Sequence, residues 1–443
     1  MLEKFFKLKE NGTTVKVEVL GGLTTFLTMA YIIFVNAGIL SKDFAGEPTG
    51  LSFHAAMLAT CIAAAVATII MGLLANYPIA QAPGMGENFF FVSVVMALGA
   101  GGVANAWQVA LGIVFIAGVL FFILSVCKFR KVIIDAVSPS LKNGIAVGIG
   151  LFITYLGLHM FNKGVIIIQN NVPQINPDIF NIKKPDLIIF FIGLFVTAGL
   201  HVRKVRGSIL IGILFTALVS LVWGKVKFEG VFGLPEEHAF LKMDLARAFS
   251  LSYIGFIAVF LFMDLFDTMG TLIGVGEQAG FIKDNKLPRA NQAMISDAAG
   301  TVVGAATGTS TVTSFIESAV GVEFGARTGL ANMVTGILFL IALFLTPIAS
   351  MIGNYPPITA PALVIVGVMM MGNIRKIDWS DYSEAIPAFL ALVGIPLTFS
   401  VHNGIALGFV SYPFIKILSG KGKEVSWVIY VVAGLIIARF VFI

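Results

Sequence analysis

The feature that most constrains this chain is a series of long apolar runs that continues from one end to the other. A helix that crosses a bilayer needs about 20 mostly apolar residues, and most runs approach that length. Only 12% of the 443 residues are charged and 58% are hydrophobic, whereas a soluble domain has about 25% charged residues. Lipid must therefore cover most of the surface, and we predict an all-α polytopic membrane protein. The runs cover 19–40, 52–75, 82–98, 105–126, 138–160, 186–201, 207–223, 249–275, 289–306, 311–325, 328–350, 359–373, 384–400 and 403–419.

Basic residues between the runs predict the orientation of the chain. They gather before the first run and after the even-numbered runs, whereas the odd-numbered loops are uncharged or of mixed sign. Loops rich in Lys and Arg remain on the cytoplasmic side. We therefore expect a cell-membrane protein with a cytoplasmic N-terminus and about fourteen transmembrane helices. The basic residues are Lys4, Lys7, Lys9, Lys16, Lys128, Arg130, Lys131, Arg203, Lys204, Arg206, Lys283, Lys286, Arg289, Arg327, Arg375, Lys376, Lys416, Lys421 and Lys423.

A further apolar run at 425–443 does not fit this arrangement. It is an additional span, a helix at the membrane surface, or a sign that two of the earlier runs form one bent helix. The pattern of charges leaves these three interpretations open.

Fourteen runs form two sets of seven, and an odd number of spans makes the second set enter the membrane in the opposite orientation. The third run of each set is interrupted. In the first set it opens with QAPGMGENFFF (81–91), and in the second with TGTSTVTSFIES (307–318). Paired broken segments at matching positions indicate a transporter site near the bilayer midplane. We therefore predict a seven-plus-seven inverted repeat.

Few carboxylates fall within the runs, and each is costly there unless it is paired, protonated or facing water. Asp264, Asp267 and Thr271 lie at i, i+3 and i+7 of the eighth run, and hence on one helical face. The functional interpretation is a polar cavity whose carboxylates bind N–H groups of a ligand, with one also taking up a proton. The alternative is that these acids bond neighbouring helices or cap broken ones. The acids are Glu87, Asp264, Asp267, Asp297 and Glu317.

The interrupted segments offer further contacts. Backbone groups freed by a break are tolerated at membrane depth only where they line a cavity or are buried in protein. Thr309, Ser310 and Thr311 either satisfy these groups or contact a ligand. Phe89 and Phe315 are suited to stacking on a flat ligand, although in a chain with 39 Phe each is equally a candidate for ordinary packing.

Other classes of protein find little support in the sequence. It contains no GxxxxGK[ST] phosphate loop, no metal-spaced His/Cys cluster and no GxSxG motif, so we predict no enzyme activity, no cofactor and no metal. The net charge of +5 does not indicate a nucleic-acid partner, because the basic residues lie in short clusters between the runs. Cys61 and Cys127 lie in apolar segments and predict no disulfide framework.

Five segments together resemble the AzgA-like purine-permease branch of the nucleobase:cation symporter and nucleobase–ascorbate transporter family. They occur in the order expected for that family, and the resemblance extends from about residue 13 through the last runs. The segments are GGLTTFLTMAYIIFVN (21–36), QAPGMGENFFF (81–91), LFMDLFDTMGTLIGV (261–275), SDAAGTVVGAATGTSTVTSFIESAVGV (296–322) and ARTGL (326–330).

The resemblance implies fourteen helices arranged as a core and a gate, with short extended segments in helices 3 and 10 meeting where the substrate lies. The single membrane domain, 1–443, would have its core at about 17–127 and 249–350 and its gate at about 128–248 and 351–443. Relatives also imply a homodimer formed through the gate.

The resemblance also implies roles for particular residues. In this family the helix 8 acid and the helix 10 glutamate hold the base, and these positions match Asp267 and Glu317, with Thr271 one turn beyond the acid. Two positions near the third run depart from the pattern. Glu87 stands where the family usually has an apolar residue, and Phe89 where the residue is commonly small. These departures put the choice of substrate in question, but not transport.

We therefore expect a secondary transporter in the lipid bilayer that imports a purine base (hypoxanthine, guanine or adenine) together with a coupling cation, a proton. The same fold carrying xanthine, uracil or an anion, or using Na⁺, is the alternative; a channel or membrane enzyme is the third hypothesis. The intramembrane acids argue against an anion. Predicted substrate-binding residues are Asp267, Glu317, Asn88, Phe89, Thr271, Phe315, Ile316 and Glu87; predicted proton-coupling or scaffold residues are Asp264, Asp297, Thr309, Ser310 and Thr311.

Overall fold

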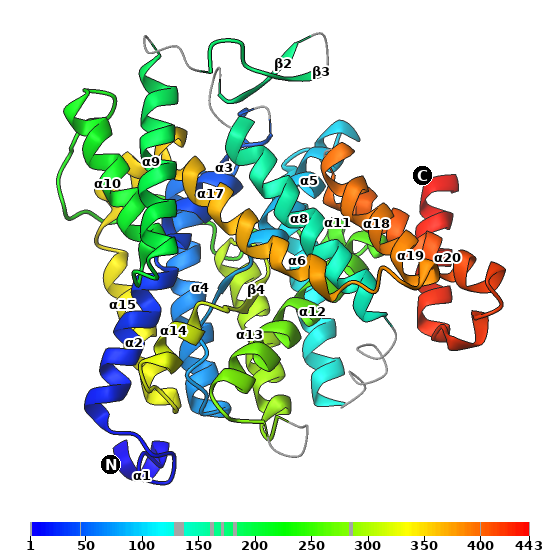
Figure 1. Cartoon of the computed structure of the whole chain (residues 1–443), viewed down its shortest axis with the longest axis horizontal. Helices are drawn as coiled ribbons and strands as arrows, with labels where there is room; N and C mark the ends of the chain where they lie inside the picture. The colour runs from blue at the N-terminus through cyan, green and yellow to red at the C-terminus, as the bar shows by residue number, and fades with distance from the viewer. Residues whose placement is uncertain are drawn as a thin grey trace.

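Helices follow the predicted runs along most of the chain (Figure 1). The structure is a computed structural model that describes residues 2–44, 46–127, 137–159, 164–169, 172–179, 184–282, 287–398 and 400–442. Within these ranges, seven stretches are long and apolar enough to cross a membrane, and further apolar helices are shorter. The predicted basic residues Lys128, Arg130, Lys131, Lys283 and Lys286 lie outside the described residues.

The first half of the chain contains the elements expected for the first seven runs. A short helix at the N-terminus precedes them, and a strand precedes the third long helix. The elements are α1 (Leu2–Phe6), α2 (Val15–Met29), α3 (Ile32–Ser41), α4 (Phe53–Leu74), β1 (Gln81–Pro83), α5 (Met85–Ala100), α6 (Ala106–Val126), α8 (Pro139–His159), α9 (Pro185–Val202) and α10 (Ser208–Val222).

The second half repeats this order, again with a strand in its third run. The elements are α12 (Ile254–Gln278), α13 (Ala290–Thr307), β4 (Val312–Ser314), α14 (Ser318–Glu323), α15 (Gly329–Ala342), α16 (Thr346–Gly353), α17 (Pro356–Met371), α18 (Tyr382–Leu397) and α19 (Val401–Leu418). The prediction of a helical bundle with extended segments in helices 3 and 10 is thus confirmed.

Several shorter elements lie between the long helices. The sequence did not predict the hairpin of β2 and β3, because the apolar residues 165–168 are consecutive and lack the alternating pattern of a half-buried strand. These elements are β2 (Ile166–Gln169), β3 (Val172–Ile175), α11 (Leu245–Ala248) and the 3₁₀ helices η1 (Leu251–Tyr253), η2 (Gly372–Lys376) and η3 (Gly422–Glu424).

The apolar run at 425–443 forms a helix of its own, α20 (Trp427–Phe442). Ile429, Val432 and Ile436 are buried on one face of this helix, and α20 packs against α19 and α12. Trp427 and Val431 are exposed. The run is therefore an additional helix with one face buried against α19 and α12.

The two interrupted runs meet as a short antiparallel ladder. Gln81 pairs with Ser314, Ala82 with Thr313 and Pro83 with Val312. The Gly84 N–H donates to the Thr311 carbonyl at 3.0 Å, and the Phe315 N–H donates to the Ala80 carbonyl at 2.9 Å. The strand residues are buried. Each broken helix therefore supplies the backbone partners that the other lacks, which is what irregular backbone needs at membrane depth.

The helices pack into two groups. In one, α4 contacts α13 and α15, α6 contacts α12 and α13, and α2 contacts α14 and α15, so that the two halves of the chain interleave. In the other, α17 and α18 pack on α8, α18 on α19, and α9 on α10 and α17. These groups contain the elements predicted as core and gate, and the domain boundaries themselves remain a prediction.

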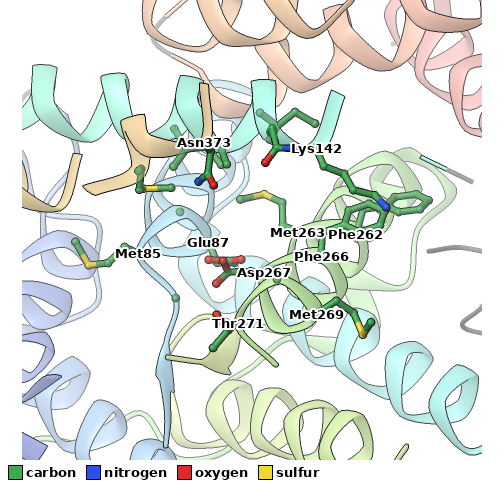
Figure 2. Close-up of a pocket in the computed structure, with 18 of the residues that line it drawn as sticks. Met85, Glu87, Lys142, Phe262, Met263, Phe266, Asp267, Met269, Thr271 and Asn373 are labelled. Carbon is green, nitrogen blue, oxygen red and sulfur yellow. The ribbon is translucent and has the colours of Figure 1, made fainter. Parts of the chain in front are cut away.

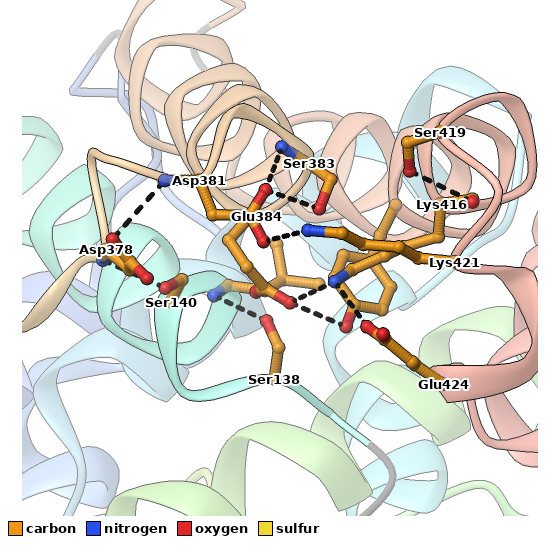
Figure 3. Close-up of polar contacts among 12 residues, drawn as sticks. Ser138, Ser140, Asp378, Asp381, Ser383, Glu384, Lys416, Ser419, Lys421 and Glu424 are labelled. Atoms are coloured by element: carbon orange, nitrogen blue, oxygen red, sulfur yellow. Dashed lines mark hydrogen bonds and ion pairs between the residues drawn. The ribbon is translucent and has the colours of Figure 1, made fainter.

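A network of ion pairs and hydrogen bonds joins three helices of the second group (Figure 3). The Lys416 ammonium on α19 lies 2.8 Å from Glu384 Oε1 on α18, and the Tyr412 hydroxyl donates to the same oxygen at 3.1 Å. The Asp378 N–H donates to the Ser140 hydroxyl at the start of α8 at 3.0 Å. The network therefore fixes one end of α8, α18 and α19 together.

A buried carboxylate joins the two halves of the first group. The Glu18 side chain on α2 is fully buried and accepts from the N–H groups of Arg327, Thr328 and Ala331 at 2.7, 3.2 and 3.2 Å. These N–H groups lie at the N-terminus of α15, where a helix lacks internal acceptors and favours a negative charge. Glu18 thus caps α15 across the bundle.

Replacing Glu18 with Ala is expected to destabilise the protein by at least about 2 kcal/mol, because it leaves buried N–H donors without an acceptor. Thermal unfolding in detergent measures this. Glu10→Gln is the control, since Glu10 forms only an exposed ion pair with Lys7, and such pairs contribute about 0–1 kcal/mol. Equal unfolding temperatures for Glu18→Ala and the control would contradict the capping role.

Candidate functional site

A cavity of ≈ 640 Å³ lies beside the crossing of β1 and β4, within the usual size range of ligand pockets. One wall comes from β1–α5, α12 and β4–α14, and the other from α8, α17, η2, α19 and α20 (Figure 2). The lining is mainly apolar. Its polar residues are Tyr31, Glu87, Lys142, Asn143, Asp267, Thr271, Ser314, Glu317, Asn373 and Lys376.

Two carboxylates lie at the centre of the cavity. Figure 2 shows the Asp267 and Glu87 side chains next to each other. Asp267, near the middle of α12, is accessible from the cavity, and its Oδ2 accepts from the Thr313 hydroxyl at 3.1 Å. Glu87, in the first turn of α5, is 3% exposed. Asp267 is therefore the more accessible of the two carboxylates.

The third carboxylate of the cavity is Glu317, which directly precedes α14. Its Oε1 accepts from the Tyr31 hydroxyl at 2.7 Å. Tyr31 lies in the bend between α2 and α3, so a residue of the first apolar run orients a side chain of the tenth run. Sequence analysis missed Tyr31, although it falls within the segment 21–36 that carries the family resemblance.

Six of the predicted substrate-binding residues line this one cavity. They come from three elements that are distant in sequence, and the i, i+4 spacing of Asp267 and Thr271 places both on the cavity side of α12. Ile316 exposes 46% of its surface, whereas Phe315 is buried to 6%. The six residues are Glu87, Asp267, Thr271, Phe315, Ile316 and Glu317.

Asn88 and Phe89 do not line the cavity. Because an α-helix turns once in about 3.6 residues, these two side chains point away from the face of α5 that carries Glu87. Asn88 is fully buried and its Oδ1 accepts from the Ser310 hydroxyl. The Phe89 ring packs against Phe44 and Phe152 at centroid distances of 6.4 and 6.1 Å.

The predicted proton-coupling or scaffold residues lie outside the cavity lining, in a buried polar layer around the strands. Asp264 Oδ2 accepts from the Thr301 hydroxyl at 2.7 Å, and Asp297 Oδ1 accepts from the Gln81 amide at 2.7 Å and from the Ser314 hydroxyl at 2.9 Å. The other residues of this layer act similarly, Thr309 accepting from Asn36 and Ser310 donating to Asn88. The Thr311 hydroxyl has no partner among the described residues.

The wall opposite the acids contains polar residues that the sequence did not single out as site residues. Lys142 in the first turns of α8 lies with its ammonium 4.5 Å from the centroid of the Phe266 ring on α12. Asn373 and Lys376 come from η2, directly after α17. No local signal distinguishes these residues from other polar residues near run ends, because only the packing of α8 and η2 against each other brings them to the cavity.

Gly84 provides the space for the Glu87 carboxylate. A Cβ at Gly84 would overlap with Glu87 Oε2 and would lie 3.1 Å from Thr313 Oγ1. Thr313 in turn donates to Asp267. The missing side chain therefore allows the first turn of α5 to fold its carboxylate back beside Asp267, so the glycine has a steric role in the site.

A membrane cavity that places carboxylates where two broken helices cross, between two packed groups of helices, defines the protein as a transporter of the inverted-repeat class. Residues 16–407 match the Permease family, and the chain belongs to this family. It is a multi-pass membrane transporter and not an enzyme.

Similar proteins span almost the whole chain. The chain is 43% identical over 451 residues to the guanine/hypoxanthine permease PbuG of Bacillus subtilis (strain 168), with 100% of both proteins covered. It is 40% identical over 447 residues to the adenine permease AdeP of Escherichia coli (strain K12), covering 100% of this chain and 96% of that protein. These relatives confirm the resemblance to the purine-permease branch.

A solved structure supports the fold. The transmembrane domain of the cyanobacterial bicarbonate transporter BicA aligns with a TM-score of 0.64 at 15% identity, covering 88% of this chain and 96% of that one. At this identity the likeness concerns the fold alone. It is consistent with the fourteen-helix inverted repeat predicted from the sequence.

Gly84→Ala is expected to lower the transport rate by roughly 10- to 100-fold, because the added Cβ would displace the Glu87 carboxylate from its place beside Asp267, and misplacing a site group by about 1 Å can cost about 100-fold. The measurement is uptake of labelled substrate by cells with matched membrane levels of each variant. Gly99→Ala in the same helix is the control, since a Cβ there meets no atom within 4 Å. Normal transport by Gly84→Ala would show that the position of Glu87 does not matter.

Proposed function

We propose that this permease imports purine nucleobases across the cell membrane by proton symport, with its N-terminus in the cytoplasm. The observation that carries the proposal is that Asp267 and Glu317 line one cavity beside the β1–β4 crossing. The relatives named guanine/hypoxanthine permease and adenine permease support a purine base as the substrate.

The cavity chemistry suits a flat, neutral ligand with N–H donors. Asp267 and Glu317 accept hydrogen bonds from ring N–H groups, and Thr271 provides a hydroxyl on the same face of α12 as Asp267. Phe315 and the apolar lining contact the faces of the ring. Asn88 and Phe89, which lie behind this surface, act by supporting α5 and not by contact with the base.

A proton is the coupling ion that fits an acid-rich site within the membrane. A carboxyl group that takes up a proton becomes neutral, which removes much of the cost of placing it in a low-dielectric environment. Glu87, beside Asp267 in the cavity, is a candidate carrier. Asp264 and Asp297 are the alternative carriers in the buried layer, where Thr309 and Ser310 bond the side chains of Asn36 and Asn88.

Transport then requires the predicted core to move against the predicted gate. The cavity reaches the exposed residues Met369 and Lys376 at the end of α17 and in η2. Arg375 and Lys376 in this segment support placing it on the cytoplasmic side, since loops rich in Lys and Arg remain there. We therefore interpret this conformation as open toward the cytoplasm, with a homodimer through the gate as the proposed assembly.

The second candidate function keeps the fold and changes the cargo to xanthine, uracil or another small ligand, with Na⁺ in place of the proton. Competition for uptake among hypoxanthine, guanine, adenine, xanthine and uracil separates the two. If none of these bases enters cells that lack their own transporters, purine transport is excluded.

Asp267→Asn and Glu317→Gln are each expected to lower uptake of the preferred base by at least roughly tenfold, because a hydrogen bond to a charged group contributes about 1.5–3 kcal/mol. Initial rates at matched membrane levels measure this. Glu277→Gln is the matched control, since Glu277 lies on α12 but outside the cavity lining. Normal uptake by both cavity variants would mean that the base binds elsewhere.

Collapsing the proton gradient is expected to abolish accumulation of the base, whereas replacing Na⁺ with K⁺ is expected to leave it unchanged. Cells expressing the protein are loaded with labelled base with and without a protonophore, and with either cation outside. Loss of accumulation only when Na⁺ is removed would reverse the assignment of the coupling ion.

A further inference from the structure

Asn373 occupies an unusual position in the cavity wall. It lies in η2, where α17 ends and the chain tightens into a 3₁₀ helix. η2 packs against α8, within the second group of helices. In Figure 2 the Asn373 amide points into the cavity, toward the side where Glu87 and Asp267 lie. An uncharged side chain of the second group therefore faces the acids of the first group across the cavity.

The Asn373 amide also lacks a hydrogen-bond partner among the described residues, and the residue is partly buried. Asn143 lines the same cavity, but its amide donates to the Pro139 carbonyl at 2.7 Å. The Asn373 amide therefore has two N–H donors and one acceptor that form no hydrogen bond with the described residues. A polar group of this kind in a mainly apolar cavity is suited to recognising a ligand.

We propose that Asn373 is a specificity-determining residue that contacts the edge of the purine carrying the 6-substituent and N7. This inference rests on the proposed function. Asp267 and Glu317 hold ring N–H groups from one side, which turns the opposite edge of the base toward η2. The base then bridges the two groups of helices, so its binding favours their approach.

The amide distinguishes the bases through their hydrogen-bonding patterns. Hypoxanthine and guanine present two acceptors, O6 and N7, whereas adenine presents the N7 acceptor and the N6 amino donor. The Asn NH₂ donates to either acceptor of a 6-oxopurine, and the complete amide pairs with N6 and N7 of adenine. A carboxylate at position 373 accepts from N6 but repels O6 and N7.

The experiment measures inhibition constants of unlabelled adenine and hypoxanthine against uptake of the labelled base that the native protein prefers. Asn373→Asp is expected to shift the ratio of the two constants toward adenine by roughly tenfold, given the discrimination of a bidentate amide–base pair. Asn143→Asp is the matched control, because it makes the same chemical change in the same cavity at an amide that is already engaged. Its ratio is expected to remain within twofold of the native value.

A second measurement changes the ligand and not the protein: 7-deazahypoxanthine lacks the N7 acceptor that the Asn373 amide is proposed to bind. Native protein is expected to bind 7-deazahypoxanthine more weakly than hypoxanthine, and Asn373→Ala is expected to abolish most of this difference, as a double-mutant cycle requires for groups in contact. Native protein and Asn373→Ala are compared at equal levels in the membrane.

An unchanged base ratio in Asn373→Asp, an equal shift in Asn143→Asp, or a preserved 7-deaza difference in Asn373→Ala would each overturn the assignment. Failure of the proposed function has a different signature, because the native protein itself would then take up none of the purines.

Discussion

The antiparallel pairing of β1 with β4 is the interaction on which the rest of this structure depends. Two helices break inside the membrane, and each break exposes backbone N–H and C=O groups that lipid cannot satisfy. The ladder from Gln81↔Ser314 to Pro83↔Val312 satisfies them. Because the partners come from opposite halves of the chain, the break in one repeat is stable only when the other repeat is folded against it.

The second constraint is the number of acids around this crossing. In the part of the chain that the structure describes, the ion pairs involve none of the five acids Glu87, Asp264, Asp267, Asp297 and Glu317. Neutral donors bond four of them instead: hydroxyls of Tyr31, Thr301, Thr313 and Ser314 and the amide of Gln81 bind Glu317, Asp264, Asp267 and Asp297. Neutral partners leave a carboxylate free to accept further hydrogen bonds or a proton, whereas a buried Arg or Lys would neutralise it.

Sequence reasoning reached the first wall of the cavity and missed the second. Asp267 and Thr271 can be predicted from the sequence because their spacing defines a helical face. Glu317 can be predicted because a carboxylate in an apolar run is rare. Asn88 and Phe89 are predicted ligand contacts because they lie in the interrupted segment with Glu87 and suit hydrogen bonding and stacking, but successive helical residues point in different directions. Asn373 has no local signal in the sequence, and Tyr31 only its place within the segment 21–36 that resembles the family. Their positions in the site depend on how η2 and the α2–α3 bend pack.

The sequence by itself determined that this chain crosses the membrane many times, that two equivalent runs are broken, and which acids lie within the runs. These are properties of hydropathy, spacing and glycine and proline content, all of which act locally. Only the tertiary structure decided which acids share the cavity, which support the strands from behind, and which side chains of the second helix group face them. That division follows from packing: whether a buried polar group meets a hydroxyl, another helix or an open cavity depends on residues hundreds of positions away, as the bonds from Tyr31 to Glu317 and from Gln81 to Asp297 show.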